Sequence, residues 1–100
     1  MLGYYTKFTT VPENRTKLVD LLLQAAAAMD KAIGCKVYDV ALDAADPMST
    51  VVTELWTDET AHDASLQSDV AKTLITQAMP LMTAPPRQIK LGPVLTSWLD

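Results

Sequence analysis

The chain has 100 residues, 49% of them hydrophobic and 20% charged, and its formal net charge is -4 with an isoelectric point near 4.7. This length predicts one domain, spanning residues 1–100, and the apolar content is sufficient for a packed core. The negative charge argues against nucleic acids and anionic membranes as partners, because no basic stripe is available to neutralise phosphates.

The cysteine content and the hydropathy pattern predict a soluble protein of a reducing compartment. Cys35 is the only cysteine, so the chain has no intramolecular disulfide and no zinc-binding Cys/His cluster. The N-terminus lacks the pattern of a signal peptide, and the most apolar stretch, residues 18–29, is too short to cross a bilayer. No glycine-rich nucleotide motif and no HExxH motif occurs. We therefore expect a cytoplasmic protein without a metal or cofactor.

The first third of the chain predicts a strand followed by a long helix. Aromatic residues and threonines favour a strand over residues 2–10. Pro12 stands where the first turn of a helix accepts proline, and apolar residues recur at helical spacing over residues 13–32. Gly34 is expected to end this helix, because glycine tolerates the positive φ found at helix C-termini.

Two further strands are expected at residues 35–42 and 50–57. The loop between them has about seven residues, which is typical of an antiparallel hairpin. The third strand contains Glu54 and Trp56, and Asp58 directly after it can cap a second helix by accepting from free backbone amides.

The second helix is expected to break in the middle. Residues 65–69 are mostly polar, and the helical pattern resumes from Val70 until Pro80 stops it. A last strand is expected at residues 87–92, with an extension over residues 94–98. The order strand, helix, strand, strand, helix, strand predicts an α+β fold of the ferredoxin-like βαββαβ type, with a four-stranded antiparallel sheet.

The strands do not alternate between apolar and polar residues as a sheet with one wet face would. The second strand is expected to place Tyr38, Val40 and Leu42 on one face and Cys35, Val37 and Ala41 on the other. The third is expected to place Val52 and Trp56 on one face and Val51 and Leu55 on the other. Two helices cover only one face, so we expect a homodimer in which the other faces pack together.

Three short motifs occur in this order: Gly34-Cys35-x-x-Tyr38, Asp43-x-x-Asp46-Pro47 and Glu54-x-Trp56. Together with the flanking helices, they resemble the antibiotic biosynthesis monooxygenase (ABM) family of dimeric α/β barrels. The resemblance implies a ferredoxin-like subunit, a dimeric barrel and a small apolar cavity between sheet and helices. It also implies an oxygenase activity, because family members include cofactor-free oxygenases that convert phenolic polycyclic compounds to quinones.

The chain departs from the family at several positions. Many members carry a histidine nine residues after the tryptophan, where this chain has Ser65. The haem-degrading relatives need a histidine about one position later and an asparagine in the first strand; here the later position is Leu66, and residues 2–10 contain no asparagine. Haem breakdown is therefore disfavoured. In quinone-forming relatives a polar aromatic side chain near the position of His62 faces the substrate.

Glu54, Trp56 and His62 are the main candidate site residues. Glu54 is either paired with a donor or, if unpaired and dry, has a raised pKa and acts as a base. Trp56 either packs in the core or lines a cavity and stacks on a flat substrate. His62 is either a satisfied core residue or the general base that takes a phenolic proton.

The predicted substrate-binding residues are Trp56, Tyr38, Tyr4 and Leu66, of which Leu66 shares a side of its helix with His62. The leading hypothesis is a cofactor-independent monooxygenase that acts on a small aromatic or phenolic compound. The alternative is a non-catalytic dimeric barrel that binds a small apolar molecule or has a stress-related structural role.

Overall fold

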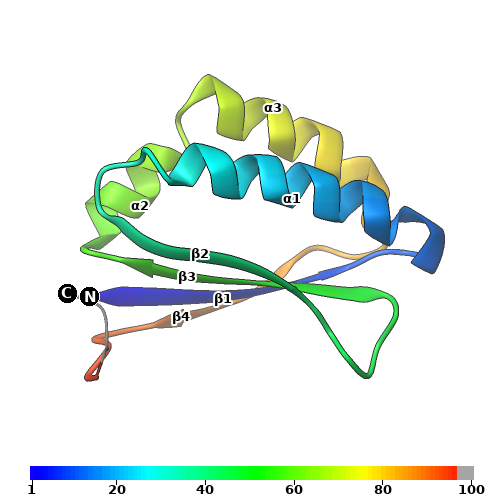
Figure 1. The fold of residues 1–100 in the computed structure, drawn as a ribbon, viewed down its shortest axis with the longest axis horizontal. Helices are drawn as coiled ribbons and strands as arrows, with labels where there is room; N and C mark the ends of the chain where they lie inside the picture. The colour runs from blue at the N-terminus through cyan, green and yellow to red at the C-terminus, as the bar shows by residue number, and fades with distance from the viewer. Residues whose placement is uncertain (97–100) are drawn as a thin grey trace.

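The computed structural model describes residues 1–96, and it confirms the ferredoxin-like fold. The strands are β1 (Leu2–Thr9), β2 (Cys35–Leu42), β3 (Ser49–Trp56) and β4 (Arg87–Leu91). The helices are α1 (Arg15–Met29), α2 (Glu59–Ser65) and α3 (Asp69–Ala78), with the short 3-10 turns η1 (Pro12–Asn14) and η2 (Met79–Leu81). The strands form one antiparallel sheet in the order β2-β3-β1-β4, and the helices lie on one side of it (Figure 1). Among residues 1–96, no helix has the length and apolar content that crossing a bilayer requires.

Helix α1 is shorter than the expected range of 13–32. Pro12 begins the separate turn η1, so α1 starts only at Arg15. The expectation that Gly34 ends the helix is wrong, because the helix ends at Met29 with Asp30 as its C-cap. Gly34 directly precedes β2 and has a φ of 88°. A Cβ atom at this glycine would lie 2.6 Å from Oγ1 of Thr57, so the close approach of the chain also requires glycine.

The break in the second helical region is confirmed, and two N-caps explain it. Asp58 accepts a 2.8 Å hydrogen bond from the Ala61 amide and begins α2. Ser68 accepts a 3.1 Å hydrogen bond from the Ala71 amide and begins α3. Each cap satisfies a backbone donor that a helix leaves free at its start, so the polar residues between α2 and α3 redirect the chain.

Strand register decides which residues face the helices. Tyr38, Glu54 and Tyr4 are direct neighbours across β2, β3 and β1, and Lys90 of β4 extends this row. Tyr4 is buried, as is Trp56 two residues beyond Glu54 on the same strand face. Glu54 and Trp56 therefore point toward the helices.

The predicted face of Cys35 is wrong. A bulge between Cys35 and Val37 shifts the register, and Cys35 lies opposite Trp56. The extra residue of the bulge, Lys36, reverses the alternation, so Cys35 points to the helix side with Tyr38. There it packs on the buried cluster that contains Trp56.

The opposite face of the sheet is open in the described residues, which agrees with the expectation that the helices cover only one face. The second copy that would cover it stays a prediction. Apolar side chains lie on this face: Ile89 is 56% and Leu91 51% exposed, and Leu55 lies on the inner strand β3 near one end of the sheet. The expected extension after β4 is not a strand over residues 92–96, although the Val94 amide donates a 2.9 Å hydrogen bond to the Met1 carbonyl. The rest of that extension, residues 97–98, lies outside the described residues.

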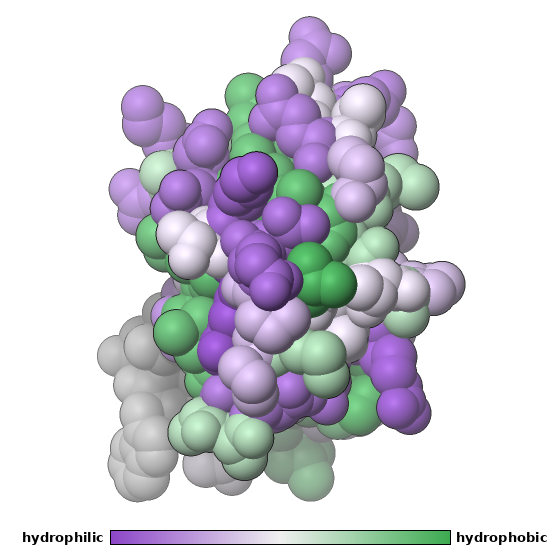
Figure 2. All heavy atoms as spheres, turned by 90° about the vertical axis from the view of Figure 1, so that its right-hand side faces the viewer, coloured by the Kyte–Doolittle hydropathy of each residue, from purple (hydrophilic) through white to green (hydrophobic). Residues whose placement is uncertain are grey.

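The end of the molecule that carries the β2–β3 loop and the start of α1 is mostly hydrophilic. Hydrophobic side chains are scattered there between hydrophilic ones (Figure 2). This end contrasts with the open sheet face, where the exposed apolar residues come from neighbouring strands.

Candidate functional site

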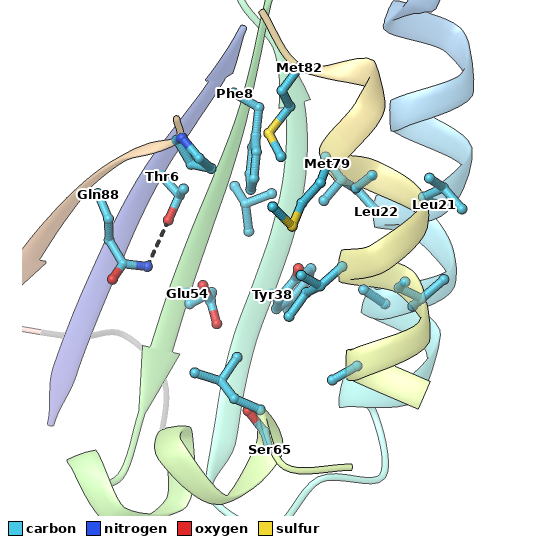
Figure 3. A pocket seen from close by; sticks show the side chains of 18 of the residues that line it. Thr6, Phe8, Leu21, Leu22, Tyr38, Glu54, Ser65, Met79, Met82 and Gln88 are labelled. Atoms are coloured by element: carbon cyan, nitrogen blue, oxygen red, sulfur yellow. Dashed lines mark hydrogen bonds between the residues drawn. The ribbon is translucent and has the colours of Figure 1, made fainter. Parts of the chain in front are cut away.

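A cavity of about 800 Å³ lies between the sheet and the helices α1, α2 and α3 (Figure 3). Its sheet side comes from all four strands, and the segment 82–86 contributes to its rim. The wall is mostly aliphatic and includes the flexible side chains of Met79 and Met82. Polar groups are few, and Glu54, Tyr38 and His62 are among them. A large apolar pocket with a few polar groups is typical of a site for a small organic ligand.

Glu54 has a partner that the sequence did not indicate. The indole Nε1 of Trp56 donates a 3.0 Å hydrogen bond to Oε1 of Glu54, two residues earlier on the strand. Because both side chains lie on one strand face, the indole holds one carboxylate oxygen while the carboxylate lines the cavity. Trp56 itself is fully buried and is not among the lining residues. Its ring thus forms the layer behind the cavity wall.

His62 is the central member of an aromatic cluster. Its ring stacks on Tyr4, with the centroids 3.9 Å apart and an interplanar angle of 14°. It also meets the Trp56 ring edge-on, with centroids 5.5 Å apart. The Nδ1 atom lies 3.0 Å from Oδ1 of Asp63. With a proton on Nδ1, this contact leaves Nε2 as the acceptor of the ring.

The structure brings most of the predicted site residues together. Tyr38, Glu54, His62 and Leu66 all line the cavity. Tyr4 does not line it, because this residue is buried under the imidazole ring of His62. Two of the predicted substrate-binding residues, Tyr4 and Trp56, therefore support the site from behind.

Burial shapes the protonation of the cavity groups. Burial raises the pKa of the Glu54 carboxyl, while the Trp56 hydrogen bond and the nearby His62 oppose this effect. Burial, together with the charge of Glu54, raises the pKa of the Tyr38 phenol. Tyr38 is therefore a hydrogen-bond donor at neutral pH, beside a carboxylate that is more readily protonated than one in water.

Sequence reasoning missed a hydrogen-bonded pair of polar residues in the cavity. The Gln88 side chain donates a 3.0 Å hydrogen bond to Oγ1 of Thr6, and both residues line the cavity (Figure 3). They are 82 residues apart in the chain, and only the pairing of β1 with β4 brings them together. Within residues 1–96, no group of three or more His, Cys, Asp or Glu side chains is arranged to hold a metal ion.

The sequence of residues 1–77 matches the family model "Antibiotic biosynthesis monooxygenase" (ABM). The chain belongs to the antibiotic biosynthesis monooxygenase family. This membership confirms the family resemblance that the sequence motifs indicated. No curated protein matches the chain significantly.

Solved structures share the ABM fold over nearly the whole chain. A protein of Chloroflexus aurantiacus J-10-fl, whose name assigns it provisionally to the antibiotic biosynthesis monooxygenases, is 28% identical, with coverage of 99% and 98% of the two chains and a TM-score of 0.86. Rv0793 from Mycobacterium tuberculosis is 24% identical, with coverage of 96% and 97% and a TM-score of 0.88. At 24% identity, the likeness to Rv0793 concerns the fold alone.

Proposed function

We propose that this ABM protein is a cofactor-independent monooxygenase that oxidises a small aromatic or phenolic compound in the cavity. The observation that carries this proposal is the grouping of Glu54, His62 and Tyr38 on the wall of a mostly apolar space of about 800 Å³. Such a space suits a flat ring system, and pockets of about 300–1,000 Å³ are usual for small ligands.

In the proposed reaction, His62 takes the phenolic proton of the substrate on Nε2. The phenolate is electron-rich enough to reduce molecular oxygen directly. One oxygen atom enters the product, which becomes a quinone, and the other leaves as water. Asp63 holds Nδ1 of His62 and so favours the tautomer that this step requires.

Glu54 and Tyr38 orient the substrate in this scheme. Tyr38 keeps its proton and donates a hydrogen bond to an oxygen of the substrate. Glu54, the direct neighbour of Tyr38 across the strands, polarises the reacting ring. The hydrogen bond from Trp56 holds the Glu54 carboxylate in place. Trp56 thus acts as a positioning residue.

The proposed assembly is a homodimer in the cytoplasm. The open sheet face carries apolar side chains from adjacent strands, among them Val37, Leu55 and Leu91. A second copy presents the same surface, so a two-fold axis allows the two sheets to cover each other. The single free cysteine suits a reducing compartment.

Oxygen uptake with a panel of hydroquinones and anthrones tests the proposed activity. Wild-type protein is expected to consume oxygen with at least one compound, and His62→Ala is expected to lose about 10²- to 10⁴-fold in rate. Gln24→Ala, at an exposed position of α1, is the matched control and is expected to keep the wild-type rate. If wild type and His62→Ala have equal rates, His62 is not the base. If no compound is consumed above the buffer rate, the oxygenase proposal fails for this panel.

A second candidate function is non-catalytic binding of a small apolar molecule. The aliphatic character of most of the cavity wall favours this reading, as does the engagement of one Glu54 oxygen by Trp56. A stress-related structural role is a variant of the same alternative. Equilibrium binding of the phenols without oxygen consumption is the result that this function predicts.

A further inference from the structure

A second polar site lies in the cavity, away from the grouping of Glu54 and His62. It consists of Thr6 on β1 and Gln88 on β4, which are direct neighbours in the strand register. Thr6 is only 5% exposed and lines the cavity. A buried hydroxyl is costly unless it has hydrogen-bond partners, so the direction of its hydrogen bonds is informative.

The hydrogen bond between these residues defines which part of the Thr6 hydroxyl is free. The Gln88 amide donates to Oγ1 of Thr6 at 3.0 Å, so the threonine oxygen is the acceptor. The hydroxyl hydrogen has no acceptor among residues 1–96. Because Thr6 borders the cavity, this hydrogen is available to an acceptor atom of a ligand.

Two other hydroxyls of the cavity wall, those of Ser65 and Thr83, differ from Thr6 in this respect. The Ser65 hydroxyl donates a 2.6 Å hydrogen bond to the His62 carbonyl. The Thr83 hydroxyl donates a 3.3 Å hydrogen bond to the Thr9 carbonyl. Both hydroxyls donate their hydrogen to a backbone carbonyl. Thr6 is therefore a hydrogen-bond donor toward the cavity, whereas Ser65 and Thr83 are not.

Strand register gives the spacing between the two polar sites. Thr6 lies opposite Val52, whereas Glu54 is two residues farther along β3. Such diagonal neighbours on one sheet face are about 7–8 Å apart. Val52, which is buried, is the direct neighbour of Thr6 and contributes to the apolar floor beside them. This separation of the strand positions is comparable to the length of an aromatic ring that carries an oxygen at each end.

We propose that Thr6, held by Gln88, is a specificity-determining residue that selects ring compounds with a carbonyl-type acceptor on the side opposite the ionisable hydroxyl. The position of that hydroxyl beside Glu54 and His62 rests on the proposed function, whereas the acceptor site rests on the Thr6–Gln88 pair alone. The ligand is thus a keto-phenol, with the ketone oxygen at Thr6.

Calorimetric binding of two matched compounds tests the proposal without requiring turnover. The probes are 6-hydroxy-1-tetralone and 5,6,7,8-tetrahydro-2-naphthol, which share the ring skeleton and phenol but differ in the ketone. Wild-type protein is expected to bind the ketone more tightly. Thr6→Val keeps the shape of the side chain, and it is expected to weaken ketone binding by roughly three- to tenfold while leaving the other compound unchanged.

Gln88→Glu provides a second variant that leaves Thr6 in place. The carboxylate has no donor and accepts the Thr6 hydroxyl hydrogen, so it is expected to abolish the preference for the ketone. Gln88 is exposed, and the substitution adds no bulk. If Thr6→Val does not fold, Gln88→Glu therefore still tests the proposal.

The outcomes separate this inference from the oxygenase proposal. A ketone preference that both variants remove supports the Thr6 site, whether or not the protein consumes oxygen. Equal affinity of the wild type for the two probes overturns it, as does an equal loss for both probes in Thr6→Val. The absence of measurable binding to the wild type also overturns it.

Discussion

The indole nitrogen of Trp56 donates a 3.0 Å hydrogen bond to Oε1 of Glu54, so a fully buried tryptophan holds a carboxylate that lines the cavity. The hydrogen bond favours the charged form of Glu54, while burial favours the neutral form. Tryptophan therefore has two functions at this position: it fills the core with its ring, and it limits how far burial raises the pKa of Glu54.

Replacement of Trp56 by phenylalanine separates these two functions. Trp56→Phe keeps an aromatic ring but removes the donor, so the pKa of Glu54 is expected to rise further above its wild-type value. The smaller ring also leaves a void, which is expected to lower the free energy of unfolding by about 2 kcal/mol. A carbon-13 NMR titration of labelled glutamate carboxyls checks the pKa, and urea unfolding checks the stability. An unchanged Glu54 titration would show that the hydrogen bond does not control its ionisation.

Glu54 also makes the stability of the protein depend on pH. Because its pKa is raised in the folded state, the folded chain binds this proton more readily than the unfolded chain does. The resulting stability is fully present below the ordinary glutamate pKa and is lost as the pH rises through the folded-state pKa. Glu54→Gln is expected to remove this decline, so its stability relative to wild type increases with pH over that window.

Urea unfolding across the acidic and neutral range measures this effect. Glu13→Gln, at an exposed position of η1, is the matched control and is expected to keep the wild-type pH dependence. If Glu54→Gln follows the wild-type curve in parallel, Glu54 does not titrate differently in the folded state.

Local signals made most of the fold predictable from the sequence. The order of elements followed from apolar periodicity, from the helix N-cap at Asp58 and from the position of Gly34, and the structure has that order. The face of Cys35 was not predictable, because the bulge at Lys36 arises from pairing with β3 and has no local signature. The start of α1 was missed because a proline at a helix N-terminus also begins a 3-10 turn.

The candidate site was predictable only where its residues are close in sequence. Glu54, Trp56 and His62 fall within nine positions, and the structure places them in one cluster with Tyr4. The depth of Trp56 behind the cavity wall depends on packing, which sequence spacing does not contain. The Thr6–Gln88 pair depends on strand register across almost the whole chain, so no local pattern in the sequence indicates it.

His62 combines packing and chemistry, and two substitutions distinguish these functions. His62→Ala removes the stack on Tyr4 and is expected to lower the free energy of unfolding by about 2–3 kcal/mol. His62→Phe keeps a stacked ring and is expected to stay within about 1 kcal/mol of wild type. Both are expected to lose oxygen consumption by about 10²- to 10⁴-fold. Thermal unfolding and oxygen uptake measure the two effects, and a fully active His62→Phe would exclude the imidazole as the base.

Gly34 joins α1 to β2 where the chain touches the start of α2. Its φ is 88°, and an added Cβ would lie 2.6 Å from Oγ1 of Thr57 and 2.7 Å from Cβ of Ala61. Gly34→Ala is therefore expected to lower the free energy of unfolding by about 2–4 kcal/mol. Gly3→Ala is the matched control, because a Cβ there meets its neighbours at an ordinary 3.5 Å. Urea unfolding of both variants measures the difference, and similar losses would contradict the steric explanation.

Leu55 lies on the inner strand β3 of the open sheet face, opposite Gly3 on one side and Val37 on the other. In the proposed homodimer this position is covered by the second copy, so a charge there is left without water or a partner. Leu55→Asp is expected to convert a dimer of about twice 10.9 kDa into a folded monomer of 10.9 kDa in sedimentation equilibrium at micromolar concentration. Leu23→Asp, at an apolar position of α1 that is 52% exposed on the helix side, is expected to remain dimeric. A monomeric wild type, or a Leu55→Asp variant that remains a dimer, would contradict assembly through the sheet.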